Sequence, residues 1–487
     1  MFAFAWAVVR AGLQSITQDE GDTYFWFAAK SARHIFDPFP NNHILNTGLI
    51  WITTHVFGLS PLTLRMPALL GAAIYIGVCC FLCRSITDRF SLQLSVLICL
   101  IYNPFLLDFM VAARGYSLAN AFLLAAIAVP VWLHVKGSPS LRTCCAVASF
   151  ALGLSFSASF SFVFVDAAAF LAIAIWALKQ RRGESIVRLA GDCVLPGLSV
   201  ALALCGYALT HWPKGELLYG ANSLREMTHS MVEVSFYQLS PRYLLIEFYD
   251  TLDFLRPMLL PLLAILCVCQ FIVTRFDGSW LEDARVRWLG TFAVSLAGVT
   301  ALCVTMSWLA FRFYRLPLPM TRTGTFLIPL CTLAAGAVAA APGRSVVSRW
   351  LRQGIGGVLI CLACYFLLCL RWTYFQEYKD GADTKKIYAV LTRLNHNYGV
   401  TDAAMDGLYV APLNFYRVLS KRETFSEFVY MPSRELPSGK SIYVLNGEAA
   451  RKFIERERLA IVYRGELSGA VVAVKPDGPI PAVRVEP

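Results

Sequence analysis

The sequence predicts an α-helical polytopic membrane protein, with about 11 transmembrane helices, interfacial helices in the first external loop and a small C-terminal α/β domain. Of 487 residues, 57% are hydrophobic and 15% are charged, whereas soluble domains have about 45–50% apolar and about 25% charged residues. Apolar runs recur along residues 1–370, and a soluble pattern follows. All 15 cysteines lie between Cys79 and Cys369, in or beside these runs, which excludes a disulfide framework.

The apolar runs have the length of about 17–25 residues that a helix needs to cross a bilayer. The first run starts at the initiating Met and is short, so we expect a first helix that a late start codon has trimmed. A signal peptide is less favoured, because no positive segment or small-residue cleavage site is present. Residues 43–57 are apolar but too short to cross, so we expect an interfacial helix there. The predicted spans are 2–17, 66–83, 91–107, 117–134, 142–158, 162–178, 190–208, 255–274, 288–308, 324–341 and 354–370.

The distribution of Lys and Arg predicts the orientation. One set of loops carries 14 of these residues in 51 positions, about three times the density of the opposite set. Basic loops stay in the cytoplasm, so the N-terminus is expected there, and the net charge of +11 is mainly an orientation signal that requires no nucleic-acid partner. The basic loops are 84–90, 135–142, 179–189, 275–287 and 342–353, and the opposite, trans-side loops are 18–65, 108–116, 159–161, 209–254 and 309–323.

Two domains are expected, a transmembrane domain at 1–370 and an extracytoplasmic α/β domain at 371–487. The second contains no glycine-rich phosphate-binding loop, so no chemistry is assigned to it. Its period-3.6 and alternating patterns predict helices at 383–398, 413–420 and 448–456 and strands at 425–430, 441–446, 458–463 and 470–474.

An acidic pair, Asp19 and Glu20, directly follows the first span. Carboxylates held against a membrane edge can act as a general base, because partial desolvation raises their proton affinity. They can also ligate a divalent cation through oxygen. The alternative is a solvated cap for the helix that follows.

Three further clusters lie on the predicted trans side. His43 follows Pro40-Asn41-Asn42 and can contact a phosphate or a metal, or simply anchor the interfacial helix. Arg114, in a short loop with Asp108 and Tyr116, can clamp a phosphate or pair with Asp108. Arg322 belongs to a group of three arginines, with Arg312 and Arg315, that calls for an anionic partner, either a ligand or lipid headgroups.

These residues resemble the motifs of the multi-spanning, GT-C type glycosyltransferases that use lipid-phosphate sugar donors, such as protein O-mannosyltransferases and lipid A aminoarabinose transferases. The resemblance covers residues 1–370. It depends on the acidic pair after the first span, on an external loop with interfacial helices that leads into Leu64–Leu70, on the Ala-Arg-x-Tyr-Ser element at 113–117 and on the Pro-x-x-Arg-Thr element at 319–323.

The resemblance implies a membrane hexosyl- or pentosyltransferase of the cell envelope, inverting, that moves a sugar from a polyprenyl phosphate to an acceptor hydroxyl. Asp19 would be the base, and Glu20 would support it or bind a cation. Arg114 and Arg322 would hold the donor phosphate, and Asp108, in the same loop as Arg114, would also bind the substrate. His43, Arg65 and Tyr116 would line the cavity.

The same resemblance implies the bacterial inner (plasma) membrane, with the C-terminal domain periplasmic. Expected partners are the lipid-linked donor, a lipid, glycan or protein acceptor and membrane lipids, with no nucleic acid. No cofactor is assigned, and a divalent cation stays open. The first loop lacks an Asp-x-Asp motif. Two other classes stay open, namely a transporter or flippase of lipid-linked sugars, for which no internal repeat is evident, and an assembly subunit.

Overall fold

The computed structural model describes the side chains of most of the chain. The backbone alone is described for 246–257 and 449, and the described residues are 2–138, 140–213, 215, 219–236, 246–421, 425–429, 437, 439–481 and 483–486. Two compact units are present. The helical unit comprises Met1–Ala7, Phe36–Asn46 and Pro67–Leu370, and the tail unit comprises Val8–Ile35, Thr47–Met66 and Arg371–Pro487. The predicted division at residue 370 stays a prediction, since the tail unit also includes two N-terminal segments.

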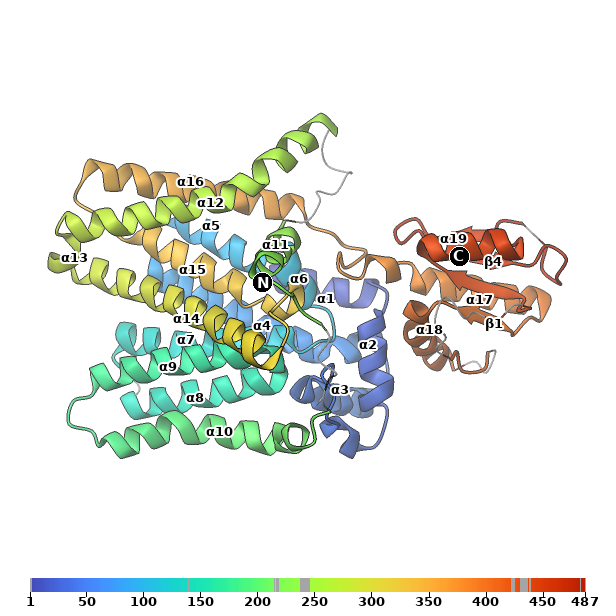
Figure 1. Ribbon diagram of the computed structural model, residues 1–487, viewed down its shortest axis with the longest axis horizontal. Helices are drawn as coiled ribbons and strands as arrows, with labels where there is room; N and C mark the ends of the chain where they lie inside the picture. Colours follow the sequence, from blue (N-terminus) through green and yellow to red (C-terminus); the bar gives the residue numbers. More distant parts are fainter. Residues whose placement is uncertain are drawn as a thin grey trace. The chain divides into compact units, whose positions relative to one another are not determined.

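Nine helices of the described residues are long and apolar enough to cross a membrane, which confirms a helical multi-pass membrane protein. In the helical unit, α7–α10 pack together, α5, α12 and α14–α16 form a second group, and α14 contacts α9 (Figure 1). The longer helices are α4 (Pro61–Ile86), α7 (Tyr116–Lys136), α8 (Leu141–Ala158), α9 (Val163–Gln180), α10 (Ile186–Thr210), α12 (Ile246–Phe276), α14 (Ala284–Tyr314), α15 (Leu327–Ala340) and α16 (Val346–Leu368).

Two of the 11 predicted spans are shorter than expected. Residues 2–17 form α1 (Phe2–Leu13), and residues 91–107 divide into α5 (Phe90–Ile101) and α6 (Pro104–Phe109). The break in the second has a local cause, because the Asn103 side chain accepts hydrogen bonds from the first turn of α6 and Pro104 begins that helix. The predicted short helix at 43–57 is α3 (Ile44–Phe57).

Shorter elements connect these helices. They are α2 (Gln18–Thr23), the π-helical turn η1 (Tyr24–Ala28), the 3₁₀ turns η2 (Ala32–Phe36), η3 (Phe160–Phe162), η4 (Thr321–Gly324) and η5 (Lys379–Gly381), α11 (Leu224–Ser235) and α13 (Ser279–Glu282).

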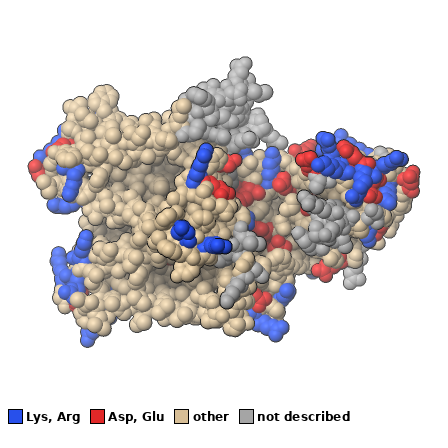
Figure 2. Space-filling model, viewed as in Figure 1, with Lys and Arg blue, Asp and Glu red and all other residues tan. Residues whose placement is uncertain are grey.

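Three of the five basic loops, 84–90, 275–287 and 342–353, are joined to one another in the helical unit. An Arg285 Nη2 lies 2.8 Å from the Asp88 carboxylate, which joins loops 275–287 and 84–90. Arg344 pairs with Glu282, and the Arg344 backbone N–H donates to Asp277 at 2.9 Å, which adds loop 342–353. Figure 2 shows Lys and Arg side chains gathered at the end of the helical unit that carries α13. Loops that were grouped by charge alone are therefore neighbours.

The C-terminal residues form a four-stranded sheet in the order β1-β2-β4-β3, with β1 parallel to β2 and the other pairs antiparallel. All residues of β2 and β4 are buried, so both faces of the sheet are covered. Figure 1 shows α19 on one side of the sheet and α17 on the other. The elements are α17 (Thr384–Tyr398), β1 (Ala403–Met405), α18 (Gly407–Ser420), β2 (Ile442–Leu445), α19 (Gly447–Glu457), β3 (Ala460–Arg464) and β4 (Val471–Val474).

Three sequence predictions for this region need correction. The helix expected at 413–420 begins at Gly407, because Asp406 caps it and Pro412 is accommodated inside it. The strand expected at 425–430 is absent from its described part, 425–429. There the backbone of Phe428 donates to and accepts from the Asn414 side chain, at 3.0 and 2.8 Å, instead of pairing with a strand. Residue 430 lies outside the described residues, and the short strand β1 was not predicted.

Tyrosine burial makes the stability of the tail unit dependent on alkaline pH. In β3, burial, with a smaller contribution from the charge of Asp383, raises the pKa of Tyr463 from 10.0 to about 12. Because the folded state disfavours the tyrosinate, this contribution is complete below pH 10 and is lost as the pH rises towards 12. Thermal unfolding of the full-length protein should therefore shift to lower temperature between these pH values.

The Tyr463→Phe variant should keep more of its stability over this interval, because it has no phenol to ionise. Tyr398, which is 40% exposed at the end of α17, provides the matched control. An equal alkaline loss of Tm in wild type, Tyr463→Phe and Tyr398→Phe would contradict the assignment to Tyr463.

Candidate functional site

A cavity of about 500 Å³ lies in the helical unit, within the size range of small-molecule sites. All five loops of the predicted trans side contribute to its lining, for example through Asn41 and His43, Tyr116, Ser159 and Ser161, Trp212 and Tyr219, and Pro317 and Arg322. Most of its wall is apolar or aromatic, and the polar side chains are few. The aromatic part consists of Phe39, Tyr116, Phe156, Phe160, Phe164, Trp212 and Tyr219.

The segment between α14 and α15 carries Arg322 to the cavity. After α14 ends, Leu318 and Ala221 exchange two backbone hydrogen bonds, at 2.8 and 3.0 Å, which bring 219–221 beside 316–320. The hydroxyl of Thr323 closes the turn by accepting from the Met320 N–H at 2.8 Å. Arg322 is thus held on a short 3₁₀ turn, η4, and not on a flexible loop.

Tyr219 and Thr321 fix the surroundings of this arginine. The Arg322 guanidinium lies over the Tyr219 ring, with its carbon 4.4 Å from the ring centroid. The Tyr219 hydroxyl is hydrogen-bonded to the Thr321 hydroxyl. Thr321 has a φ of +42°, which for a β-branched residue costs about 1–3 kcal/mol and occurs mainly where surrounding contacts impose it. The turn that carries Arg322 is therefore strained at Thr321 and held in place by the surrounding contacts.

His43 lines the same cavity and is 5% exposed. Its Nδ1 lies 3.0 Å from the Ala158 carbonyl oxygen. Because a carbonyl only accepts, Nδ1 carries the hydrogen, and Nε2 is the acceptor of the neutral ring. The His43 ring also packs edge-on against Tyr116 at 4.9 Å between centroids. Gly115 allows Ala158 and His43 to lie this close to the loop, since a Cβ at residue 115 would be 1.8 Å from the Ala158 oxygen and 2.9 Å from His43 Nδ1.

Arg114 is buried beside this group, with 1% of its surface exposed. One of its Nη atoms donates to the Asn41 side-chain oxygen, and Asn41 lines the cavity. Asn46 Nδ2 donates to the Ala113 carbonyl at 3.2 Å and fixes the backbone before Arg114. Asp108 is buried in α6 and does not belong to the cavity lining.

The acidic pair lies in the tail unit. There, Glu20 takes part in a helix cap and in a buried ion pair. Thr17 caps α2, with the Glu20 N–H donating to Thr17 Oγ1 at 3.2 Å and the Thr17 N–H donating to Glu20 Oε2 at 2.9 Å, which is a capping box. Arg65 Nε and Nη2 each donate to one Glu20 oxygen at 2.7 Å. Both side chains are fully buried.

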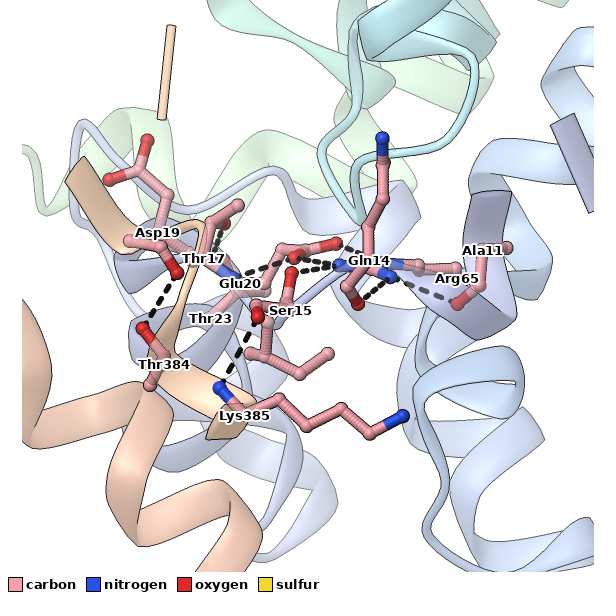
Figure 3. Close-up of polar contacts among 12 residues, drawn as sticks. Ala11, Gln14, Ser15, Thr17, Asp19, Glu20, Thr23, Arg65, Thr384 and Lys385 are labelled. Carbon is pink, nitrogen blue, oxygen red and sulfur yellow. Dashed lines mark hydrogen bonds and ion pairs between the residues drawn. The ribbon is translucent and has the colours of Figure 1, made fainter. Parts of the chain in front are cut away.

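Arg65 also closes the end of α1. Its Nη1 donates to the Ala11 and Gln14 carbonyls, each at 2.9 Å, and its Nη2 donates to the Ser15 carbonyl at 2.8 Å. Together with the two bonds to Glu20, these contacts use the five N–H groups of a guanidinium. The carbonyls at a helix C-terminus need such donors. Figure 3 shows Arg65 between the end of α1 and Glu20.

Asp19 has a different environment. It is half-buried, and Figure 3 shows its side chain directed away from the Arg65–Glu20 pair. The Tyr378 hydroxyl donates to Asp19 Oδ2 at 2.9 Å. Asp19 Oδ2 thus accepts from a tyrosine hydroxyl, whereas both Glu20 oxygens accept from a guanidinium.

The structure divides the predicted site residues between the units. His43, Tyr116 and Arg322 line one cavity, and Arg114 contacts it through Asn41. Asp19, Glu20 and Arg65 belong to the tail unit. The contacts of Glu20 and Arg65 favour structural roles over substrate contact, whereas the roles of the others stay predictions. Sequence reasoning did not identify Tyr219 or Trp212, because single aromatic residues in a long loop carry no distinctive pattern.

A divalent cation also stays a prediction. Both Glu20 oxygens accept from Arg65, so of the acidic pair Asp19 is the better candidate ligand. Within the described part of the chain, no group of three or more His, Cys, Asp or Glu residues is arranged to hold a metal ion.

Removing Arg65 should destabilise the protein strongly. Arg65→Ala leaves the buried Glu20 carboxylate without its partner, which typically costs about 3–5 kcal/mol. We expect a large fall in the Tm of the purified protein, measured by intrinsic fluorescence. Arg33→Ala is the control, since Arg33 is an exposed arginine of the same unit. Similar melting temperatures for the two variants would refute the structural role.

No protein-family model and no curated protein matches the sequence. Among solved structures, the chain is similar to ArnT from Cupriavidus metallidurans bound to undecaprenyl phosphate, with a TM-score of 0.51 and 11% identity over 98% of this chain and 97% of that one. ArnT from the same organism in the apo state matches with a TM-score of 0.42 and 12% identity, over 100% and 98% of the chains. The first likeness confirms the predicted fold: the chain has the helical membrane architecture of ArnT.

Proposed function

We propose that the protein is a membrane glycosyltransferase that transfers a sugar from a polyprenyl-phosphate donor to an acceptor hydroxyl. The main support is the cavity of the helical unit, which combines a wall of aromatic side chains with the fixed Arg322 guanidinium. A lipid-linked phosphate has the same two properties, an apolar chain and an anionic group. The likeness in fold to ArnT, solved with undecaprenyl phosphate, supports this ligand class.

Cationic groups can stabilise a phosphate as it leaves the sugar. As the bond between the sugar C1 and the phosphate oxygen breaks, negative charge grows on the polyprenyl phosphate, and a guanidinium held in advance stabilises that charge. Arg322 is held by its turn and by the Tyr219 ring. Arg114 is buried and oriented by Asn41. We assign the donor phosphate to Arg322 and Arg114, with His43 and Tyr116 in contact with the donor.

Asp19 is the proposed general base. The acceptor hydroxyl would attack C1 on the face opposite the phosphate, so that the new C1–O bond forms with inversion, and the hydroxyl proton would pass to the Asp19 carboxylate. The contacts of Glu20 support this division of labour, because both of its oxygens already accept from Arg65. Its proposed role is therefore to hold α2, which carries Asp19.

The proposed location is the inner membrane of a bacterium, with the basic loops and the N-terminus in the cytoplasm and the cavity on the periplasmic side. Two observations support this orientation: ion pairs join three of the five basic loops, and loops of the opposite set line the cavity. The sugar would be a hexose or pentose, and the acceptor a lipid, glycan or protein.

Asp19→Asn should abolish transfer while the protein stays folded. An amide cannot accept the proton, and loss of a general base typically lowers rates by about 100-fold or more. The measurement is transfer of radiolabelled sugar from a polyprenyl-phosphate donor, together with the Tm. Asp22→Asn, which changes another half-buried carboxylate of α2, is the matched control. Full activity of Asp19→Asn would remove Asp19 from the mechanism.

Arg322→Ala should weaken binding of the polyprenyl phosphate by about tenfold or more, the usual worth of a hydrogen bond to a charged group. Acceptor affinity should change much less. Arg312→Ala removes an exposed arginine at the end of α14 and should leave both affinities unchanged. Equal weakening of donor and acceptor binding by Arg322→Ala would argue against a phosphate clamp.

A further inference from the structure

Within the tail unit, the chain that follows the last membrane helix packs against the ends of α1 and α2. Phe375, 2% exposed, lies beneath two guanidinium groups, with the Arg10 and Arg65 carbons 5.4 and 5.3 Å from its ring centroid. Arg10 Nη2 also donates to the Tyr374 carbonyl at 3.3 Å. Phe375 therefore packs against Arg65, the arginine that also binds Glu20, and Arg10 holds the Tyr374 backbone.

This anchor delivers Tyr378 to Asp19. Tyr378 lies three residues beyond Phe375, their rings pack edge-on at 6.3 Å, and the Tyr378 hydroxyl donates to Asp19 Oδ2 at 2.9 Å. We propose that Tyr378 is a positioning residue for Asp19, so that the C-terminal domain contributes a contact to the proposed general base. The proposal rests on the proposed function, in which Asp19 is the general base.

The C-terminal domain has its own contacts with the same N-terminal segment. The Ile16 N–H donates to the Tyr416 hydroxyl at 3.0 Å, and Ser15 Oγ donates to the Ala382 carbonyl at 2.6 Å. Gly21 allows α2 and α18 to approach closely, since a Cβ there would lie 2.8 Å from the Ala411 backbone carbon. These contacts fix α2 against the domain without involving the Asp19 carboxylate, so docking and positioning can be separated by mutation.

A positioning hydrogen bond is useful here because α2 has only six residues and Asp19 is half-buried. An aspartate has two side-chain torsions, and small displacements of a general base lower the rate strongly. Glu20, the neighbouring carboxylate, is fixed by Arg65. In the proposed role, the Tyr378 hydroxyl restrains the Asp19 carboxylate through its hydrogen bond to Oδ2.

The test compares two single-hydroxyl deletions in the full-length protein. Tyr378→Phe should lower kcat for sugar transfer about tenfold and leave the KM for the polyprenyl-phosphate donor unchanged. Tyr416→Phe removes a hydroxyl from the same docking surface and should lower the Tm but leave kcat unchanged for the folded protein. Adding Tyr378→Phe to Asp19→Asn should cause no further loss of the residual rate, because the hydroxyl acts only through that carboxylate.

A wild-type kcat in Tyr378→Phe, or an equal fall in kcat in Tyr416→Phe, would overturn the positioning role. So would a further loss of the residual rate in the double variant, which would indicate a general structural effect. Failure of the proposed function gives a different pattern, since Asp19→Asn itself would then keep its activity. An inactive Asp19→Asn with a fully active Tyr378→Phe would remove only the role of Tyr378.

Discussion

The tail unit depends on one guanidinium. Arg65 binds both oxygens of Glu20 and three carbonyls at the end of α1, and both charged side chains are buried. Burial of either charge alone would be costly, so each requires the other. This pair joins the end of α1, the capped start of α2 and the beginning of α4. Asp19 directly precedes Glu20 in α2, so its backbone position depends on the same contacts. Of the two acids that follow the first helix, Glu20 therefore has a structural role, and Asp19 is the proposed general base.

The helical unit follows a second constraint, the separation of polar groups to the two ends of a bundle in an apolar solvent. Three of the basic loops join one another by ion pairs at one end. The five opposite loops build the cavity, where turns at Gly115 and Thr321 hold His43, Arg114 and Arg322 in place. The aromatic wall and the fixed Arg322 guanidinium are the two features on which the proposed lipid-linked phosphate donor rests.

Much of this was predictable because hydropathy and loop charge report directly on the membrane. The helical fold, the interfacial-length helix α3 and the grouping of the loops all follow from such patterns. Local hydrogen bonds were less accessible, as when Asn103 divided a predicted span and Asn414 replaced a predicted strand partner at Phe428. The pairing of Glu20 with Arg65, 45 residues apart, and the contact of Tyr378 with Asp19, 359 residues apart, have no local signal, so the roles of the two acids could not be separated from sequence alone.

A glycosyltransferase breaks the bond between the sugar and the polyprenyl phosphate, whereas a flippase only moves the intact lipid across the membrane. The most direct test reconstitutes the purified protein in liposomes with a polyprenyl-phosphate donor that carries a radiolabelled sugar, and supplies candidate acceptors. Our account predicts the stoichiometric appearance of free polyprenyl phosphate and labelled acceptor. Movement of intact lipid-linked sugar to the other leaflet, with no release of polyprenyl phosphate, would contradict it and identify a flippase.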